Sequence, residues 1–346
     1  MGRKYHKITM LIIIVFICVS LSACTPGERP YASPAATDEP PVTPGAPSAP
    51  THDPAVTPSI DPEIHFKDVN LENVVREHLN KNIGPIFVSD VREIKVLSAR
   101  VRGILNIEDL VFFSGLEELD LYGNRISDLR PLSKLINLKS LTISANYSPL
   151  YASGSSGLDL TPLKSLSKLE TLRADSNFIT DISPLSHLTS LKVLSLSKNR
   201  ISDVAALKSL TLLVHLNLSA NIGTQADTPG ISDIRCISDM KHLEYLDVSD
   251  NIVVSLEAAA LLENLKTVLA NGNLISDISY FAGNHSIVYL NCEYNLIPVF
   301  DVILEMRALQ TVLYHGNFIV DYEAIDAFYA SRPDPYANNL FTNFTK

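Results

Sequence analysis

The 346-residue chain contains no tryptophan, and aromatic residues make up only 7% of it. Large rings therefore cannot dominate its interior, although 46% of the residues are hydrophobic, enough for a large core. Such a composition is expected when one repeated pattern supplies the core. The part of the chain that is expected to fold has no run of Lys and Arg, and the formal net charge is −10. The composition therefore argues against binding to nucleic acids.

Sequence signatures of catalysis are also missing. The chain has no GxSxG, HExxH or CxxC motif and no phosphate-binding loop. Glu244, Asp247 and Asp250 lie close together in the sequence but lack the spacing and the glycine of a known calcium loop, so a solvated acidic face is expected. We therefore predict no enzyme, no metal site and no cofactor.

Residues 1–23 are predicted to be an export signal. Basic residues at positions 3, 4 and 7 precede an apolar run over residues 8–19, which is too short to span a membrane comfortably. The run leads to Leu21, Ser22, Ala23 and Cys24, and this segment resembles the signal of bacterial lipoproteins. The resemblance implies that Cys24 becomes the new N-terminus and carries a lipid, which would anchor the exported chain to a membrane, facing the exterior of a Gram-positive cell. An ordinary signal peptide with a chance Cys is the alternative.

Residues 24–62 are predicted to be a disordered linker. Positions 25–62 contain 11 prolines among 38 residues, together with Ala, Thr and Ser, a composition that cannot form a core. A proline-rich chain reaches about 3.1 Å per residue, so this stalk could extend on the order of 100 Å. Its expected role is to hold the following domain away from the membrane.

A repeated pattern occupies residues 90–322. Its clearest copy contains Leu191, Leu194, Leu196, Asn199 and Ile201, at steps of three, two, three and two. The same steps recur at residues 116–126, 169–179, 243–253, 265–275, 287–297 and 309–319. This is the pattern of leucine-rich repeats, and we count about ten of them, most 22 residues long.

Three copies of the pattern are irregular. Those that begin at Leu138 and Leu213 are interrupted after their Asn by insertions of about nine residues after Asn146 and about eight after Asn221. The first copy is weaker. It is assigned to Val91, Ile94, Val96 and Val101, and Ala99 takes the place of the Asn. Both insertions fall at the same point of the repeat, so they should emerge on one edge of the stack. A binding role and neutral growth of a tolerant loop are both open for them.

The spacing of the repeat predicts its structure. Leu194 and Leu196 are two apart, so they point to the same face of a short strand, and only stacked repeats can bury such faces. We therefore predict an α/β solenoid, curved, with short parallel strands on its concave face and 3-10 or helical turns on its convex face. The Asn amides are expected to bond backbone groups of the adjacent turn, in a ladder of nine: Asn124, Asn146, Asn177, Asn199, Asn221, Asn251, Asn273, Asn295 and Asn317. A second set is expected to cap the convex turns: Asp128, Asp181, Asp203, Asp233, Asp277 and Asp321.

An open stack of strands needs a cover at each end. Residues 63–89 are predicted to form an N-terminal helical cap, started by Asp68 or Asn70 and ended by Gly84 and Pro85. Its apolar face would contain Leu71, Val74, Val75 and Leu79. Residues 323–346 are predicted to form a C-terminal cap and tail, with a closing helix suggested by Tyr322, Ile325, Phe328 and Tyr329.

A helical cap followed by 22-residue repeats with ISDxxPLxxL after the Asn resembles the internalin-type leucine-rich repeats of Gram-positive bacteria. The resemblance covers residues 64 to about 322 and implies the fold, but it implies no particular function, because this scaffold serves many unrelated partners. The immunoglobulin-like domain and the wall-sorting tail of internalins are missing from this sequence. Host-cell invasion is therefore not implied.

The concave face offers the best candidate site. Side chains that flank the buried strand residues should form rows across the repeats, and the C-terminal rows collect aromatic, aliphatic and charged residues: Tyr245, Asp247, Leu269, Tyr289, Asn291, Glu293, Tyr294, Leu313 and His315. Contiguous exposed Tyr and Leu favour an interaction site, with Glu244, Asp247, Glu293 and Lys266 providing selectivity. The alternative is that the aromatic residues pack on one another near the C-terminal cap.

The sequence thus favours a non-enzymatic, surface-anchored module that binds a protein through its concave face. A cell-wall or other glycan, stacked on Tyr side chains, is one alternative ligand. A structural envelope lipoprotein without a discrete ligand is the other. Cys236 and Cys292 are expected three repeats apart, about 14 Å, which is too far for a disulfide.

Overall fold

The computed structural model describes residues 61–146, 157–222 and 229–331, all within one compact unit, Ser59–Lys346. The predicted export signal, Cys24, nearly all of the linker and of the two insertions, and the C-terminal tail lie outside the described residues. Among the described residues, no helix is both long enough and apolar enough to cross a membrane.

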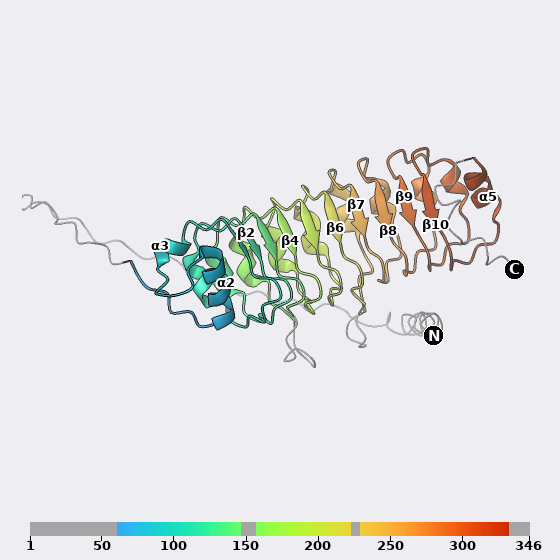
Figure 1. The fold of residues 1–346 in the computed structure, drawn as a ribbon. Coiled ribbons are helices and arrows are strands. Elements are labelled where there is room, and N and C mark those ends of the chain that lie inside the picture. Colours follow the sequence, from blue (N-terminus) through green and yellow to red (C-terminus); the bar gives the residue numbers. More distant parts are fainter. Residues whose placement is uncertain (1–60, 147–156, 223–228, 332–346) are drawn as a thin grey trace, which may run out of the picture. The chain divides into compact units, whose positions relative to one another are not determined.

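Ten short strands form one parallel sheet in the order of the sequence (Figure 1). They are β1 (Val96–Ser98), β2 (Glu118–Asp120), β3 (Ser140–Thr142), β4 (Thr171–Arg173), β5 (Val193–Ser195), β6 (His215–Asn217), β7 (Tyr245–Asp247), β8 (Thr267–Leu269), β9 (Tyr289–Asn291) and β10 (Thr311–Leu313). The central residue of each strand is buried and pairs with the central residue of the next, as Leu194 does with Leu216. The core is thus a continuous column of aliphatic side chains.

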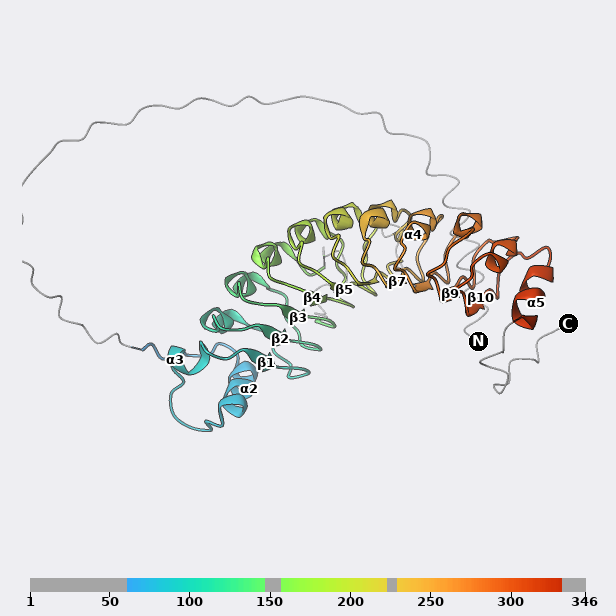
Figure 2. The same cartoon turned by 90° about the horizontal axis from the view of Figure 1, so that it is seen from above.

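Short turns return the chain on the opposite side of this core. They are η1 (Glu108–Phe112), η2 (Arg130–Lys134), η4 (Thr161–Ser165), η5 (Ser183–His187), η6 (Ala205–Ser209), η7 (Arg235–Asp239), α4 (Glu257–Ala260), η8 (Ser279–Phe281) and η9 (Asp301–Leu304). Within the compact unit, the strands line the inner side of a curve and the turns its outer side (Figure 2). The predicted leucine-rich-repeat solenoid, with parallel strands on the concave face and 3-10 turns on the convex face, is confirmed.

The predicted Asn ladder is present in all nine repeats that carry it: eight of the side chains are buried, and Asn317 is half-buried but makes equivalent bonds. Asn199 shows its geometry: its side chain is 4% exposed, and its amide donates to the carbonyls of Ala174 and Leu196 at 3.0 and 2.9 Å. Its oxygen accepts from the backbone N–H groups of Asn177 and Ile179, both at 3.0 Å. Each ladder Asn therefore joins its own strand to the preceding repeat through buried backbone groups.

The six predicted turn caps are also confirmed. The Asp203 carboxylate accepts from the backbone N–H of Ala205 at 2.8 Å, and the other five do the same two residues on. Asp159, which the sequence reading did not include, caps η4 in the same way, through the N–H of Thr161. These bonds satisfy N–H groups at the start of each turn.

The register assigned to the first repeat is wrong. Leu97 pairs with Leu119, so Leu97 and Ala99 face the core, whereas Val96 and Val101 are 49% and 67% exposed. Two sets of apolar residues fit the repeat here, one with Val96 and Val101 and one with Leu97 and Ala99. Only the set with Leu97 and Ala99 aligns with the strand that follows.

Arg102 consequently occupies the ladder position of the first repeat, where its backbone N–H donates to the side-chain oxygen of Asn124 at 3.1 Å. Val101, just before it, has φ 53°. The left-handed region is strongly unfavourable for a β-branched residue. The first repeat therefore stores backbone strain at an exposed position.

The N-terminal cap contains α2 (Val69–Leu79) and α3 (Val88–Val91). As predicted, Leu71, Val74 and Val75 are buried. The predicted end at Gly84 and Pro85 is wrong, because the helix stops at Asn80, which adopts φ 51° and bonds back to the last turn. Asn tolerates this left-handed conformation better than most residues do.

Asp68 is the N-cap of α2 and also fixes the helix to the first repeat. One carboxylate oxygen accepts from Asn70 N at 2.9 Å and Leu71 N at 3.3 Å, and the other from Leu105 N at 2.7 Å and Asn106 N at 3.0 Å. Burial opposes ionisation, but the four N–H groups outweigh it and lower the pKa of Asp68 below its usual value. This carboxylate therefore stabilises the cap in its charged form.

The last strand is covered by α5 (Glu323–Ala330). Two residues of this helix, Ile325 and Phe328, are buried. The hydroxyl of Tyr329, also in α5, donates to the carbonyl of Val312 in β10 at 2.5 Å. The predicted closing helix is therefore present at the end of the stack.

Candidate binding surface on the concave face

Two rows of side chains cross the concave face in the order predicted. In the first, the strand register places His215, Tyr245, Thr267 and Tyr289 on β6 to β9. In the second, it places Asp247, Leu269, Asn291 and Leu313 on β7 to β10. Six of the nine predicted site residues thus lie on the four consecutive strands β7 to β10, and Glu293, Tyr294 and His315 follow β9 and β10.

The concave face over β3 to β5 satisfies its own polar groups. Asp175 accepts from the hydroxyls of Ser195 at 2.5 Å, Ser197 at 2.9 Å and Ser144 at 2.9 Å. The backbone N–H of Ser197 adds a fourth bond at 2.8 Å. Because these groups already bond one another, this part of the face gains little by binding a partner.

An aromatic pair marks the change from this polar part to the C-terminal part. The rings of His215 and Tyr245 stack with centroids 4.2 Å apart and planes at 7°. Burial lowers the pKa of His215, the positive charge of Arg173 lowers it further, and Asp247 and Asp175 oppose both. His215 is therefore neutral at physiological pH. The sequence reading left His215 out of the candidate site, although its row position beside Tyr245 could have revealed the stack.

Leu269 and Leu313 are the most distinctive residues of the second row. At the equivalent place, other strands carry polar residues such as Thr142, Ser195 and Asn217. Both leucines are half-buried. The two strands therefore present aliphatic side chains where the rest of this row is polar.

The predicted tyrosines are not one cluster. Thr267 separates Tyr245 from Tyr289 in the register. Tyr294 has φ 55° at the turn after β9, and its ring lies where a side chain on Gly316 would clash, at 2.5 Å. Tyr294 therefore lies at the border of the concave face and depends on a glycine in the next repeat.

The predicted charges are mostly paired within the protein. Asp247 is only 8% exposed and accepts from Ser249 N and its hydroxyl at 3.0 and 2.6 Å, so its predicted role as an exposed selectivity charge is wrong. Glu244 accepts from Lys266 at 2.7 Å, and Glu293 lies 3.5 Å from His315. The first pair precedes β7 and β8 and the second follows β9 and β10, so the two pairs lie at opposite ends of these strands.

The predicted alternative, aromatic packing at the C-terminal cap, applies to a different tyrosine. Tyr314 lies at an inward position of β10's repeat and contacts Phe300, Tyr322 and Tyr329, with ring centroids 6.2, 6.4 and 6.5 Å away. It also stacks on His315 at 4.7 Å. Tyr314 thus supports the cap, and it holds the ring of His315 at the edge of the candidate surface.

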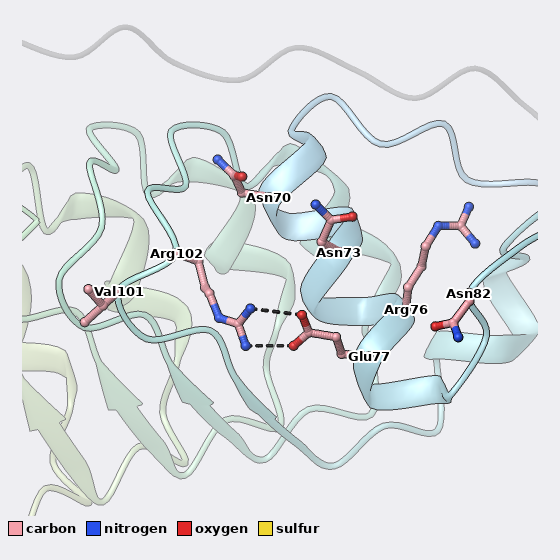
Figure 3. A pocket seen from close by; sticks show the side chains of 7 residues that line it. All are labelled: Asn70, Asn73, Arg76, Glu77, Asn82, Val101 and Arg102. Atoms are coloured by element: carbon pink, nitrogen blue, oxygen red, sulfur yellow. Dashed lines mark hydrogen bonds and ion pairs between the residues drawn. The ribbon is translucent and has the colours of Figure 1, made fainter.

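A pocket of about 440 Å³ lies at the other end of the repeats, between α2 and the first repeat (Figure 3). Its lining is polar except for Val101: Asn70, Asn73, Arg76, Glu77, Asn82, Val101 and Arg102. The guanidinium of Arg102 bonds the Glu77 carboxylate at 3.0 and 2.7 Å across it. These two charges neutralise each other, the third charged lining residue, Arg76, is paired with Glu72, and no predicted site residue lines the pocket.

Among the described residues, no three His, Cys, Asp or Glu side chains come together in a way that could hold a metal ion. Cys236 and Cys292 are free thiols, and burial raises the pKa of each to about 12, so both stay protonated at neutral pH.

Comparison with known proteins agrees with this architecture. Residues 114–152 and 189–228 match the family model described as Leucine Rich repeats (2 copies). The fold is a leucine-rich-repeat solenoid. Domains of this fold typically bind proteins and are generally non-catalytic.

Several solved structures share this fold. An internalin (inlF) from Listeria monocytogenes is 24% identical with a TM-score of 0.62, over 76% of this chain and 80% of that one. An internalin C2 (inlC2) from the same organism is 26% identical with a TM-score of 0.53, over 72% and 94%. The functional domain of InlJ, also from Listeria monocytogenes, is 21% identical with a TM-score of 0.62, over 75% of this chain and about half (53%) of that one. No match was found among curated protein sequences.

Proposed function

We propose that this protein is a non-enzymatic binding module that holds another protein against strands β7 to β10 of its concave face. The observation that carries the proposal is that Leu269 and Leu313, on either side of Asn291 in the register, are aliphatic and half-buried in a row that is otherwise polar. Covering such side chains with a partner is worth about 25 cal/mol per Å² of apolar surface. The polar groups over β3 to β5, in contrast, are already bonded to one another.

The surroundings of the two leucines fit a protein interface. The aromatic groups Tyr245 and Tyr289 lie on the neighbouring row, and the Glu244–Lys266 and Glu293–His315 pairs lie around them. An apolar centre with a polar rim is the usual anatomy of a binding site for a protein. The concave surface of a solenoid can receive such a partner along several repeats.

We further propose that the module is displayed outside the cell by a lipid on Cys24, with residues 24–62 as the stalk. The proposal rests on the sequence of the N-terminal segment. Replacing Cys24 by Ser should move the protein from the membrane fraction to the medium and abolish incorporation of labelled fatty acid. Equal membrane retention of both forms would contradict the lipid anchor.

The binding proposal is tested by affinity capture from envelope and secreted fractions of the source cells, with Ser59–Lys346 as bait. The variant is Leu269→Asn/Leu313→Asn, because Asn occupies the same strand position in β6 and β9. The matched control is Leu261→Asn/Leu304→Asn, two leucines of the convex turns that are 59% and 49% exposed.

We expect one protein to be retained by the wild type and the control and lost by the concave variant. Retention by all three baits would place the contact elsewhere. Retention of glycan instead of protein would support the glycan alternative, and retention of nothing would support a structural role.

A further inference from the structure

A second apolar surface lies on the side of the solenoid, outside the concave face. The residue that follows each ladder Asn flanks a buried Ile in extended chain, so its side chain faces outward. Toward the N-terminus this position is mixed, with Phe178 between Arg125 and Arg200, and Ile222 and the buried Ile252 follow. In the last three repeats it holds Leu274, Leu296 and Phe318, so the C-terminal part of the row is apolar throughout.

Nearby positions of the same repeats extend this surface. Val254 and Val320 lie two residues further along their repeats, and Val299 lies three further along its own, between Asp277 and Asp321 of the neighbouring repeats. These three valines, Val254, Val320 and Val299, are 56%, 77% and 47% exposed, and Phe318 is 68% exposed. We name the set of six the lateral strip: Val254, Leu274, Leu296, Val299, Phe318 and Val320. Exposed apolar side chains gathered in this way mark interaction sites.

Backbone bonds between repeats make the lateral strip continuous. Leu274 N donates to Val253 O at 3.0 Å, Leu296 N to Ile275 O at 2.8 Å and Val320 N to Pro298 O at 3.1 Å. These donors are already used within the protein. A partner must therefore bind through side chains rather than by adding a strand.

The repeats that carry the lateral strip are strongly acidic as a whole. Residues 244–331 contain 12 Asp and Glu but only two Lys and Arg, a formal charge of −10 that equals that of the whole chain. The exposed Asp277 and Asp321 border the strip on its convex side, where they cap η8 and α5. Lys266, one of the two cations, is paired with Glu244 beside the concave face.

We propose that the lateral strip binds a basic amphipathic helix of a partner protein. Its apolar residues span four repeats, about 15 Å at 4.8 Å per repeat, which matches about three helical turns of 5.4 Å. The acidic border complements Lys and Arg on the polar face of such a helix and repels anionic lipid and nucleic acid. This surface is separate from the concave site, so either can exist without the other.

The probe for this test is a fluorescein-labelled peptide of about 14 residues, two copies of Leu-Lys-Lys-Leu-Leu-Lys-Leu, which forms a basic amphipathic helix. Its binding to Ser59–Lys346, which contains the whole described core and both caps, is followed by anisotropy. Phe318→Ser/Val320→Ser removes the two most exposed apolar groups of the strip and should weaken binding at least about tenfold. Leu261→Ser/Leu304→Ser on the convex turns is the matched control and should bind like the wild type.

Charge is tested separately with Asp277→Asn/Asp321→Asn, because Asn keeps the oxygen that caps each turn. Binding should weaken about threefold and lose part of its salt dependence. A peptide with Glu in place of Lys should not bind. Absence of peptide binding, equal binding by all variants, or equal binding of the Glu peptide would overturn the proposal. Because Leu269→Asn/Leu313→Asn should leave peptide binding unchanged, failure of the concave site would be distinguishable from failure of this one.

Discussion

Replacing Asn199 by Ala should be among the most damaging single changes in this protein. The side chain is 4% exposed, and four of its five bonds to backbone groups, at 2.9–3.0 Å, join two repeats. Each buried backbone group left without a partner costs about 1–3 kcal/mol. With partial relief by entering water, we expect the free energy of unfolding to fall by about 4 kcal/mol.

The control for this change is Asn264→Ala. Asn264 also donates to a backbone carbonyl, that of Lys241 at 2.7 Å, but on an exposed turn where water can replace it. We expect a loss below about 1 kcal/mol there. Urea denaturation followed by circular dichroism gives both values.

Hydrogen exchange tests the location of the effect. The amide protons of Asn177 and Ile179, which donate to Asn199, should lose protection first in the Ala variant. A loss of stability below about 1 kcal/mol, or unchanged exchange at these two amides, would refute the role assigned to the ladder.

Three further predictions follow from single side chains. Asp68→Ala should lower the free energy of unfolding by about 2–3 kcal/mol, because four N–H groups lose their acceptor. Since the pKa of Asp68 is lowered in the folded state, its stabilisation is present above the unfolded pKa of about 3.9 and is lost as the pH falls through the lower folded pKa. Acid denaturation of the wild type and the variant measures this difference. Val101→Gly should raise the melting temperature by relieving about 1 kcal/mol of strain, whereas Val101→Ile should not. His215 should titrate below its usual pKa of about 6.5 in an NMR titration, and Arg173→Gln should raise its pKa; an unchanged value would contradict the electrostatic coupling.

The fold could be predicted from the sequence because each repeat carries the same physical requirements. Two apolar residues two apart, an Asn three further on and an Asp before the turn recur at fixed spacing, so errors in one repeat do not affect the next. The register predicted for the first repeat is wrong because Arg102 stands in place of the Asn that marks the register. Val96 and Val101 also fit the apolar positions of the pattern, although both are exposed. Neighbouring context, here the pairing of Leu97 with Leu119, decides such cases.

The site was predicted less completely, because row positions do not reveal which side chains bond to each other. The row position of Asp247 predicts an exposed charge. Its carboxylate, however, accepts a hydrogen bond from the hydroxyl of Ser249, two residues later, and the residue is buried. The sequence does not predict His215 as a site residue, because a single His indicates no contact until its neighbour on the next strand is known. Tyr314 occupies a core position, so its contacts with the closing helix depend on residues that follow the repeats.

Photo-crosslinking in intact cells tests the central proposal, that the C-terminal concave face holds a protein, most directly. Benzoylphenylalanine is introduced at position 289 in β9 or, as a control, at position 304 in η9, and the adducts are identified by mass spectrometry. The proposal predicts that position 289 yields a covalent adduct with one protein, that position 304 does not, and that Leu269→Asn/Leu313→Asn abolishes the adduct. No adduct at position 289, or the same adduct at both positions, would contradict it.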